Sequence, residues 1–349
     1  MPLGRCIKRG TCTFLLLLLA ACGGEPPLLP AAKLLQIVTS VQATIPFIAS
    51  GSYGVGEALQ LNLPAGKSYR DALALRVLLP EAPPKNTARG EGEAPALIIF
   101  SHGNWSDADR YEPLLSFWVS HGYAVLAPTH LDGRSMARGI FNSLRYGQLG
   151  LIEGRVNDIQ RVLDSLGDIE QRSGQRFDRN RIALAGHSFG AFTVQQFAGA
   201  IASDEGQIVQ VVDQRIRAVI ALSPPGPMFD VIHAKSWLNM RGPVLVTTGT
   251  WDSNPQFWPD WRLHLMSYET AQAGDLYSLV IDGADHYLGN LICRPERKVE
   301  PQHDALRMIN AVTVQFLSAY LNHDEAALGY IKSATLTQQT NGFAVLENR

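Results

Sequence analysis

A serine flanked by small residues stands directly after a short apolar run near the middle of the chain. The run covers residues 182–185, and residues 186–190 that follow read Gly-His-Ser-Phe-Gly, with Ser188 at the centre. This Gly-x-Ser-x-Gly pattern is typical of a tight turn from a strand into a helix, where the small residues let the two elements approach each other. Such a turn exposes the hydroxyl at the edge of a sheet. Ser188 is therefore the candidate nucleophile.

A serine hydroxyl needs a base to act as a nucleophile, and the base needs an acid to orient it. In this kind of site the two partners come later in the chain, in the order acid and then histidine. Asp252 follows the apolar run 244–248, and His286 follows the run 279–281. We expect His286 to take the proton of Ser188 and Asp252 to hold the imidazole tautomer. Activity should then fall on the acid side, near pH 6 to 7, roughly the unperturbed histidine range.

Other residues remain open for these two roles. Asp230 is the alternative acid, although a proline-rich stretch separates it from the preceding apolar run. His303 is the alternative base, but it follows no apolar run, and His187 should point away from the serine on a tight turn. We interpret Asp282 and Asp285 as turn or solvated carboxylates, because adjacent residues on a loop rarely face each other.

An oxyanion also needs hydrogen-bond donors. The apolar run 96–100 leads into Ser-His-Gly-Asn-Trp at residues 101–105. A His-Gly pair after such a strand is the usual setting for one backbone donor, and the residue after the nucleophile supplies the second. We therefore predict an oxyanion hole formed by the backbone amides of Asn104 and Phe189. A plain turn with a capping Ser or Asn is the alternative.

Aromatic residues gather in the sequence around the predicted acid and base loops. We predict that Trp105, Trp251 and Tyr287 contact the substrate in an apolar or aromatic pocket, although aromatic side chains are often simply core. The segment from Arg134 to Gly150 is a candidate lid because of its length. Cys293 is expected to be a buried, inert thiol.

The elements that must position these residues show in the apolar pattern after residue 94. Short apolar runs without alternation recur, and such runs suit strands buried on both faces. They cover residues 96–100, 124–127, 182–185, 218–222, 244–248 and 279–281. Between and after them, apolar residues step by three and four over 152–166 and 306–320, as on one face of a helix. The alternation predicts an α/β fold, a mainly parallel sheet with helices on both faces and the site at the carboxyl ends of its strands.

These features resemble the α/β-hydrolase superfamily over residues 72–321. Within it they are most similar to the platelet-activating-factor acetylhydrolase and dienelactone-hydrolase-like group, through residues 100–103, 120–128 and 186–190. The resemblance implies ester hydrolysis through an acyl-enzyme, with no metal and no other cofactor. The chain departs from the group at two positions. Ala191 stands where the family usually has Gly, and Ser223 stands where the acetylhydrolases carry the triad acid.

The N-terminus has the layout of a secretory signal. Basic residues precede an apolar run that is too short to span a bilayer. The run ends in Leu-Ala-Ala-Cys at residues 19–22, which resembles the lipobox of bacterial lipoproteins, where the cysteine is acylated. Cys22 is therefore the candidate lipidation site, and Gly23 after it favours the outer membrane. The alternative is an ordinary signal that is cut beside Ala20 and Ala21.

We divide the chain into a lipoprotein signal peptide (1–21), a tether (22–45), an α/β-hydrolase domain (46–325) and a C-terminal tail (326–349). Of the 349 residues 46% are hydrophobic and 18% charged, which indicates a globular protein rather than a disordered one. The formal net charge is −2 and no basic stripe stands out, so we expect no nucleic acid partner. No metal-ligand spacing is present, so we expect no metal site.

Two classes of function are consistent with these observations. The first is a lipid-anchored serine esterase, whose partners are a small-molecule ester and, through the anchor, a membrane of the cell envelope. The second is a non-catalytic binding lipoprotein that keeps the same fold. A peptidase or an acyltransferase would use the same triad.

Overall fold

The computed structural model describes residues 33–36, 45–64, 72–81 and 93–349. The predicted signal peptide, Cys22 and most of the predicted tether lie outside the described residues. So does most of the proline- and glycine-rich stretch that precedes residue 93.

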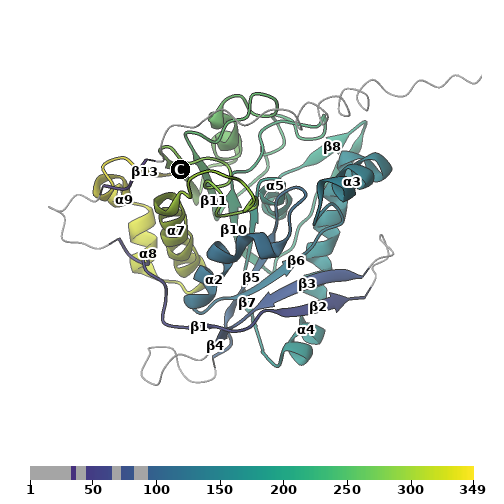
Figure 1. The fold of residues 1–349 in the computed structure, drawn as a ribbon, viewed down its shortest axis with the longest axis horizontal. Coiled ribbons are helices and arrows are strands. Elements are labelled where there is room, and N and C mark those ends of the chain that lie inside the picture. The colour runs from purple at the N-terminus through teal and green to yellow at the C-terminus, as the bar shows by residue number, and fades with distance from the viewer. Residues whose placement is uncertain (1–32, 37–44, 65–71, 82–92) are drawn as a thin grey trace, which may run out of the picture.

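A nine-stranded sheet forms the centre of the molecule (Figure 1). Its spatial order is β13 (Ala344–Asn348), β12 (Leu276–Ile281), β11 (Val244–Gly249), β10 (Ile216–Leu222), β7 (Asp178–His187), β5 (Ala96–Ser101), β6 (Ala124–Pro128), β3 (Leu73–Leu78) and β2 (Leu59–Leu63). The strands from β12 to β6 run parallel, while β13, β3 and β2 are each antiparallel to the neighbour on their inner side. The mainly parallel sheet predicted from the apolar runs is therefore confirmed.

Successive side chains of the parallel strands enter two different hydrophobic cores. In β5, Ile98 and Phe100 belong to one core, and Leu97 and Ile99 belong to the other. Because both faces are covered, every residue of this strand is buried, which explains why its sequence shows no alternation.

Helices cover both faces of the sheet (Figure 1). One core is completed by α2 (Glu112–Ser120), α7 (His303–Leu321), α8 (Glu325–Ile331) and α9 (Thr335–Gln339). The other is completed by α3 (Met136–Asp164), α4 (Leu166–Ser173) and α5 (Phe189–Gln195). The two helical patterns in the sequence correspond to the second half of α3 and to α7.

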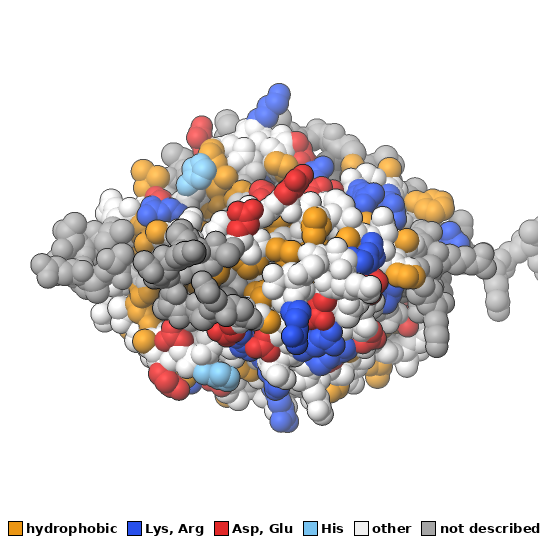
Figure 2. Space-filling model, turned by 90° about the horizontal axis from the view of Figure 1, so that it is seen from below, with side chains coloured by type: hydrophobic (Ala, Val, Ile, Leu, Met, Phe, Trp, Pro, Cys, Tyr) orange, Lys and Arg blue, Asp and Glu red, His pale blue; other side chains and the backbone are white. Residues whose placement is uncertain are grey.

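Short elements connect these layers. They are the 3-10 helices η1 (Ala108–Tyr111), η2 (Gln196–Ala198) and η3 (Trp261–Leu265), the helix α6 (Met266–Thr270), and the two-stranded pairs β1 (Gly54–Val55) with β4 (Pro80–Glu81) and β8 (Ala202–Asp204) with β9 (Gln207–Val209). Among the described helices, none combines the length and apolar character needed to cross a bilayer. On the face shown in Figure 2, acidic and basic side chains are interspersed over the described surface.

The C-terminal segment corrects the predicted domain boundary. Residues 326–349 were expected to form a tail, but they contain most of α8, all of α9 and the edge strand β13. Strand β13 pairs with β12 along its length, from Tyr277–Asn348 to Ile281–Ala344. The folded domain therefore continues to the end of the described chain.

The candidate lid is helical for most of its length. From Met136 onward it forms the first part of α3, which is interrupted at Gly147, where φ is +71°. A Cβ at Gly139 would lie only 1.9 Å from the Trp105 ring, so this part of the helix packs directly against Trp105.

Candidate active site

The turn from β7 into α5 holds Ser188 in an unusual backbone conformation, with φ 54° and ψ −123°. Two glycines make the turn possible. A Cβ at Gly186 would lie 2.3 Å from the Gly190 carbonyl oxygen, and a Cβ at Gly190 would lie 2.0 Å from the Ser101 carbonyl oxygen. Strand, helix and the neighbouring strand therefore approach so closely that only glycine fits at these positions. Ser188 comes immediately before the first residue of α5 and lines a cavity.

The structure brings the three predicted catalytic residues together. The Ser188 hydroxyl lies 2.9 Å from His286 Nε2, and His286 Nδ1 lies 2.8 Å from Asp252 Oδ1. The second carboxylate oxygen of Asp252 accepts a hydrogen bond from the Thr248 hydroxyl at 3.1 Å. Since Nδ1 donates to the carboxylate, Nε2 is free to accept the serine proton.

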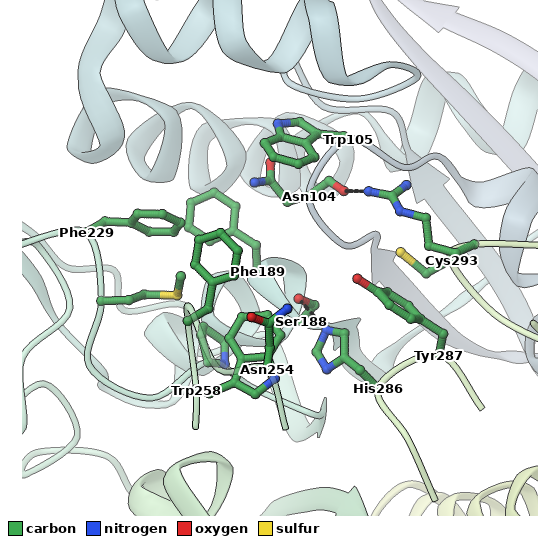
Figure 3. A pocket seen from close by; sticks show the side chains of 14 residues that line it. Asn104, Trp105, Ser188, Phe189, Phe229, Asn254, Trp258, His286, Tyr287 and Cys293 are labelled. Carbon is green, nitrogen blue, oxygen red and sulfur yellow. Dashed lines mark hydrogen bonds between the residues drawn. The ribbon is translucent and has the colours of Figure 1, made fainter. Parts of the chain in front are cut away.

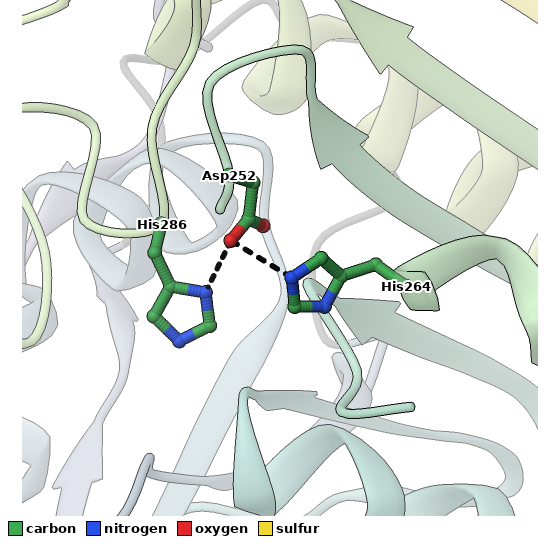
Figure 4. A group of neighbouring side chains, drawn as sticks. All are labelled: Asp252, His264 and His286. Atoms are coloured by element: carbon green, nitrogen blue, oxygen red, sulfur yellow. Dashed lines mark hydrogen bonds and ion pairs between the residues drawn. The ribbon is translucent and has the colours of Figure 1, made fainter. Parts of the chain in front are cut away.

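A second histidine on the same carboxylate was not found from the sequence. His264, in η3, places Nε2 2.9 Å from Asp252 Oδ1 and Nδ1 2.7 Å from the Pro224 carbonyl oxygen (Figure 4). Its contact with Asp252 is a close ion pair rather than a well-aligned hydrogen bond. Both neighbouring oxygens can only accept, and Asp252 raises the pKa of the imidazole, so this position favours the protonated form of His264.

The three groups have different charges for physical reasons. Burial opposes a charged Asp252, but the two histidines outweigh burial and hold the pKa of its carboxyl well below the usual range. Burial also opposes a charged His264, yet Asp252 beside it raises the pKa of that imidazole. At His286 burial prevails over the attraction of Asp252, so the pKa lies below 6.5. The resting site thus holds a neutral base beside a charged pair.

The predicted oxyanion hole lies at the same cavity. Asn104 and Phe189 both line it, and neither of their backbone amides donates a hydrogen bond within the described part of the chain. Phe189 is the first residue of α5, where the backbone N–H groups have no partner inside the helix.

A chain of hydrogen bonds connects residues 101–105, the predicted oxyanion loop, to His286. The Gly103 amide donates to the Tyr111 hydroxyl at 2.9 Å, and Tyr111 lies 2.9 Å from His187 Nδ1. His187 Nε2 lies 2.9 Å from the carbonyl oxygen of His286, to which it donates. Burial lowers the pKa of His187 to about 4, which keeps Nδ1 free to accept the tyrosine proton. His187 therefore points away from Ser188, as expected.

A buried arginine contacts the predicted oxyanion loop from the opposite side, where the second hydrophobic core lies. Arg155, in α3, donates to the His102 carbonyl oxygen at 2.7 Å and forms two hydrogen bonds with Asp132, at 2.9 and 2.6 Å. Its guanidinium also lies 4.8 Å from the centre of the Phe189 ring. Burial opposes a charged Asp132, but Arg155 outweighs it and lowers the pKa of the carboxyl to about 2.

Six of the fourteen residues that line the cavity in front of Ser188 are Trp, Phe or Tyr (Figure 3). The cavity is open to solvent and has about 110 Å³ of room for the centres of water-sized molecules. It is lined by Asn104, Trp105, Ser188, Phe189, Pro225, Met228, Phe229, Asn254, Phe257, Trp258, His286, Tyr287, Cys293 and Arg294.

Two of the three predicted substrate-contacting residues line this cavity, and one does not. Trp105 and Tyr287 belong to the lining, but Trp251 does not. Asp252 directs its side chain inward to His286, and its chain neighbour Trp251 lies outside the lining. Trp258 lines the cavity where Trp251 was expected, and its ring centre lies 4.9 Å from that of His286.

The alternative residues lie elsewhere. Asp230 is exposed, and His303 is exposed at the start of α7. Asp285 accepts hydrogen bonds from the amides of Tyr287 and Gly289, as expected of a turn carboxylate. Cys293 is buried and free, and it also lines the cavity.

One group of described side chains has a composition that suits a metal ion. Ligand atoms of Asp252, His264 and His286 lie within 4.8 Å of one another. His286 Nδ1 donates to Asp252, and His264 Nε2 faces the same carboxylate oxygen at 2.9 Å, so the contacts within the group are those of a hydrogen bond and an ion pair.

Comparisons with known proteins agree with this geometry. A family model described as "Alpha/beta hydrolase family" matches residues 98–321. The platelet-activating factor acetylhydrolases of Cavia porcellus and Canis lupus familiaris are each 28% identical to the chain, over 43% of this chain and 40% of each relative. The chain thus spans less than half the length of these curated relatives.

Solved structures share the fold. A ferulic acid esterase from Streptomyces cinnamoneus matches with a TM-score of 0.56 and 17% identity, covering 79% of this chain and 93% of that one. An acylaminoacyl peptidase from Pyrococcus horikoshii matches with a TM-score of 0.50 and 14% identity, covering 77% of this chain and 42% of that one.

Proposed function

Because the chain belongs to the Alpha/beta hydrolase family, we propose that it hydrolyses carboxylic esters through an acyl-enzyme formed on Ser188. The observation that carries this proposal is the continuous relay from the Ser188 hydroxyl through His286 to Asp252, with contacts of 2.9 and 2.8 Å at the cavity. A binding protein without catalysis has no need of a buried carboxylate that orients a neutral imidazole toward a strained serine.

The proposed reaction has two halves. Ser188 Oγ attacks the ester carbonyl carbon while its proton moves to His286 Nε2, and the resulting oxyanion accepts hydrogen bonds from the amides of Asn104 and Phe189. His286 then gives the proton to the alcohol oxygen as the C–O bond breaks. Water attacks the acyl-enzyme with the same base, which releases the acid and restores Ser188. Throughout, Asp252 stabilises the imidazolium that forms on His286.

The lining of the cavity supports an apolar or aromatic substrate. Trp105 and Tyr287, which we propose as substrate contacts, flank the catalytic groups in Figure 3. The acetylhydrolases that resemble the chain are named for cleaving an acyl group from platelet-activating factor, which is consistent with an ester as the substrate class.

The proposed mechanism is tested by labelling and turnover. The wild-type protein should react with a fluorophosphonate probe and hydrolyse a panel of 4-nitrophenyl esters of increasing acyl length. Ser188→Ala should abolish labelling and lower turnover by several orders of magnitude, because the triad acts as a unit. Ser253→Ala, an exposed serine next to the proposed acid, is the matched control and should retain both. Ester hydrolysis that survives in Ser188→Ala would refute the mechanism.

We also propose that the mature protein is anchored to the outer membrane through an acylated Cys22. The support is the lipobox-like sequence at residues 19–22, and several acyl chains would give stable binding where one gives only marginal binding. Intact mass of protein extracted from membranes measures this directly. An unmodified Cys22, or cleavage at another position, would contradict the anchor while leaving the hydrolase proposal intact.

A further inference from the structure

One arginine lines the catalytic cavity without a carboxylate partner. Arg294 donates from Nη2 to the carbonyl oxygen of Asn104 at 3.0 Å, and no ion pair joins it to a carboxylate in the described part of the chain. The lining of the cavity contains no Asp and no Glu. Arg294 is thus a permanent positive charge that faces an aromatic cavity.

The other arginines of this region are paired. Arg297 binds Asp285 at 2.9 Å, and Arg110 binds Glu296 at 2.7 Å. A partly buried cation loses hydration, and a carboxylate normally compensates it. Among the described residues, the Arg294 side chain has one carbonyl oxygen as a hydrogen-bond partner, so its remaining N–H groups are available to a molecule in the cavity.

We propose that the preferred substrates are esters that carry an aromatic ring and a carboxylate, and that Arg294 binds this carboxylate. The inference rests on the proposed esterase function and adds a substrate class to it. The planar guanidinium presents paired donors that match a carboxylate, and the aromatic walls of the cavity suit a ring. The carboxylate takes no part in bond making, because the ester bond is still attacked by Ser188 and the alcohol still leaves with the proton from His286.

A pair of substrates that differ only in charge tests the inference. 4-Acetoxybenzoate and 4-acetoxybenzamide have the same size, and both release acetate from a phenol. The wild-type protein should hydrolyse the benzoate with the higher kcat/KM. In Arg294→Gln the ratio of the two kcat/KM values should fall at least about tenfold, the range expected for one lost hydrogen bond to a charged group. Arg307→Gln removes an arginine that is paired with Asp304 and should leave the ratio unchanged.

The outcomes separate this inference from the esterase proposal. Equal losses on both substrates in Arg294→Gln would mean that the arginine only supports the Asn104 loop, and would overturn the inference. A wild-type protein that shows no preference for the anion would overturn it too, even if the variant failed to fold. If the protein hydrolyses the acetate ester of 4-acetoxybenzamide and this activity requires Ser188, the esterase proposal stands in either case. The unsubstituted compounds give a second test. Benzoate itself should inhibit the wild-type protein competitively, whereas benzamide itself should not, and equal inhibition by the two would contradict the inference.

Discussion

At the scale of single residues, the carboxylate of Asp252 faces two histidines whose pKa values are shifted in opposite directions. Asp252 raises the pKa of His264, whereas burial lowers the pKa of His286, so the protonated form is favoured at His264 and the neutral form at His286. A positive charge beside Asp252 offsets part of its negative charge, so the carboxylate attracts a proton to His286 less strongly. We infer that His264 is a positioning residue that keeps the base ready to accept the serine proton.

The pH profile should show the consequence of this environment. Activity needs neutral His286, so kcat/KM should be full above its pKa and should fall as the pH drops through it. Burial lowers this pKa below 6.5, so the half-maximal point should lie below that value rather than across the range expected from the sequence. A kcat/KM profile on a neutral ester measures it. A half-maximal point at or above pH 7 would contradict the structure.

Replacing His264 should shift the acid side of this pH profile, called the acid limb below. In His264→Gln the positive charge beside Asp252 is lost, so the carboxylate should stabilise protonated His286 more strongly. The pKa of His286 should rise, because the repulsion from His264 that lowers it is removed. His233→Gln, on the surface, is the control and should leave the limb in place. A lower turnover with no shift of the limb would show that His264 has only a structural role.

The sequence predicted the three candidate triad residues, which directly follow strands and lie within hydrogen-bond distance in the structure, but it missed two neighbouring residues that come from other elements. Ser188, Asp252 and His286 each stand just after a buried apolar run, and the geometry of a parallel sheet brings such positions together. His264 comes from a 3-10 helix and Arg294 from a long loop, so no period or spacing connects them to the site. Trp251 was assigned from its nearness to the acid loop, which does not determine where a side chain points.

At the scale of elements, helix α3 supports the predicted oxyanion loop, residues 101–105, through Arg155. This side chain spans the carbonyl of His102 and the carboxylate of Asp132, both of which are buried. The oxyanion loop is therefore fixed from one core by Arg155 and from the other by Tyr111. The sequence predicted the apolar face of α3 but not this polar contact, because a single arginine in a helix more often faces solvent.

Removing Arg155 should destabilise the fold. Arg155→Met leaves the Asp132 carboxylate buried without its partner, and breaking such a pair typically costs about 3–5 kcal/mol. In the wild-type protein the pKa of about 2 keeps this carboxyl ionised at pH 7, so the ion pair that the substitution breaks is present under ordinary conditions. Urea unfolding measures the free energy. Arg145→Met, exposed on the same helix, is the control, and a loss below about 1 kcal/mol in Arg155→Met would contradict the assigned role.

The central strands and the edge strands differ in how well their sequences reveal them. The parallel strands are buried on both faces and read as continuous apolar runs. The edge strand β2 alternates between half-buried and exposed side chains, and its five residues carry little signal. β13 likewise has only Ala344 and Leu346 buried. Edge strands are recognised by what they pair with, which a single sequence does not show.

At the scale of the whole molecule, the C-terminal segment closes one edge of the sheet. β13 covers β12, the strand that ends at the loop of His286. The segment after residue 325 was predicted to be a tail, and it contains the polar stretch Thr-Gln-Gln-Thr-Asn at 337–341. Its large apolar side chains are few and widely spaced, yet they are buried in the core that also contains α7.

Deleting residues 326–349 should therefore prevent stable folding. The segment buries Ile331, Leu336, Phe343 and Leu346, and each such side chain contributes about 1.5–3 kcal/mol. Together they contribute on the order of 10 kcal/mol, which is comparable to the whole stability of a typical domain, about 5–15 kcal/mol. The deletion also exposes β12 as a long edge that favours aggregation. Leu336→Ala should destabilise by about 2–5 kcal/mol, and the exposed Gln338→Ala should change nothing. Thermal unfolding and ester hydrolysis report the outcome, and a soluble, active protein that ends at residue 325 would show that the segment is dispensable.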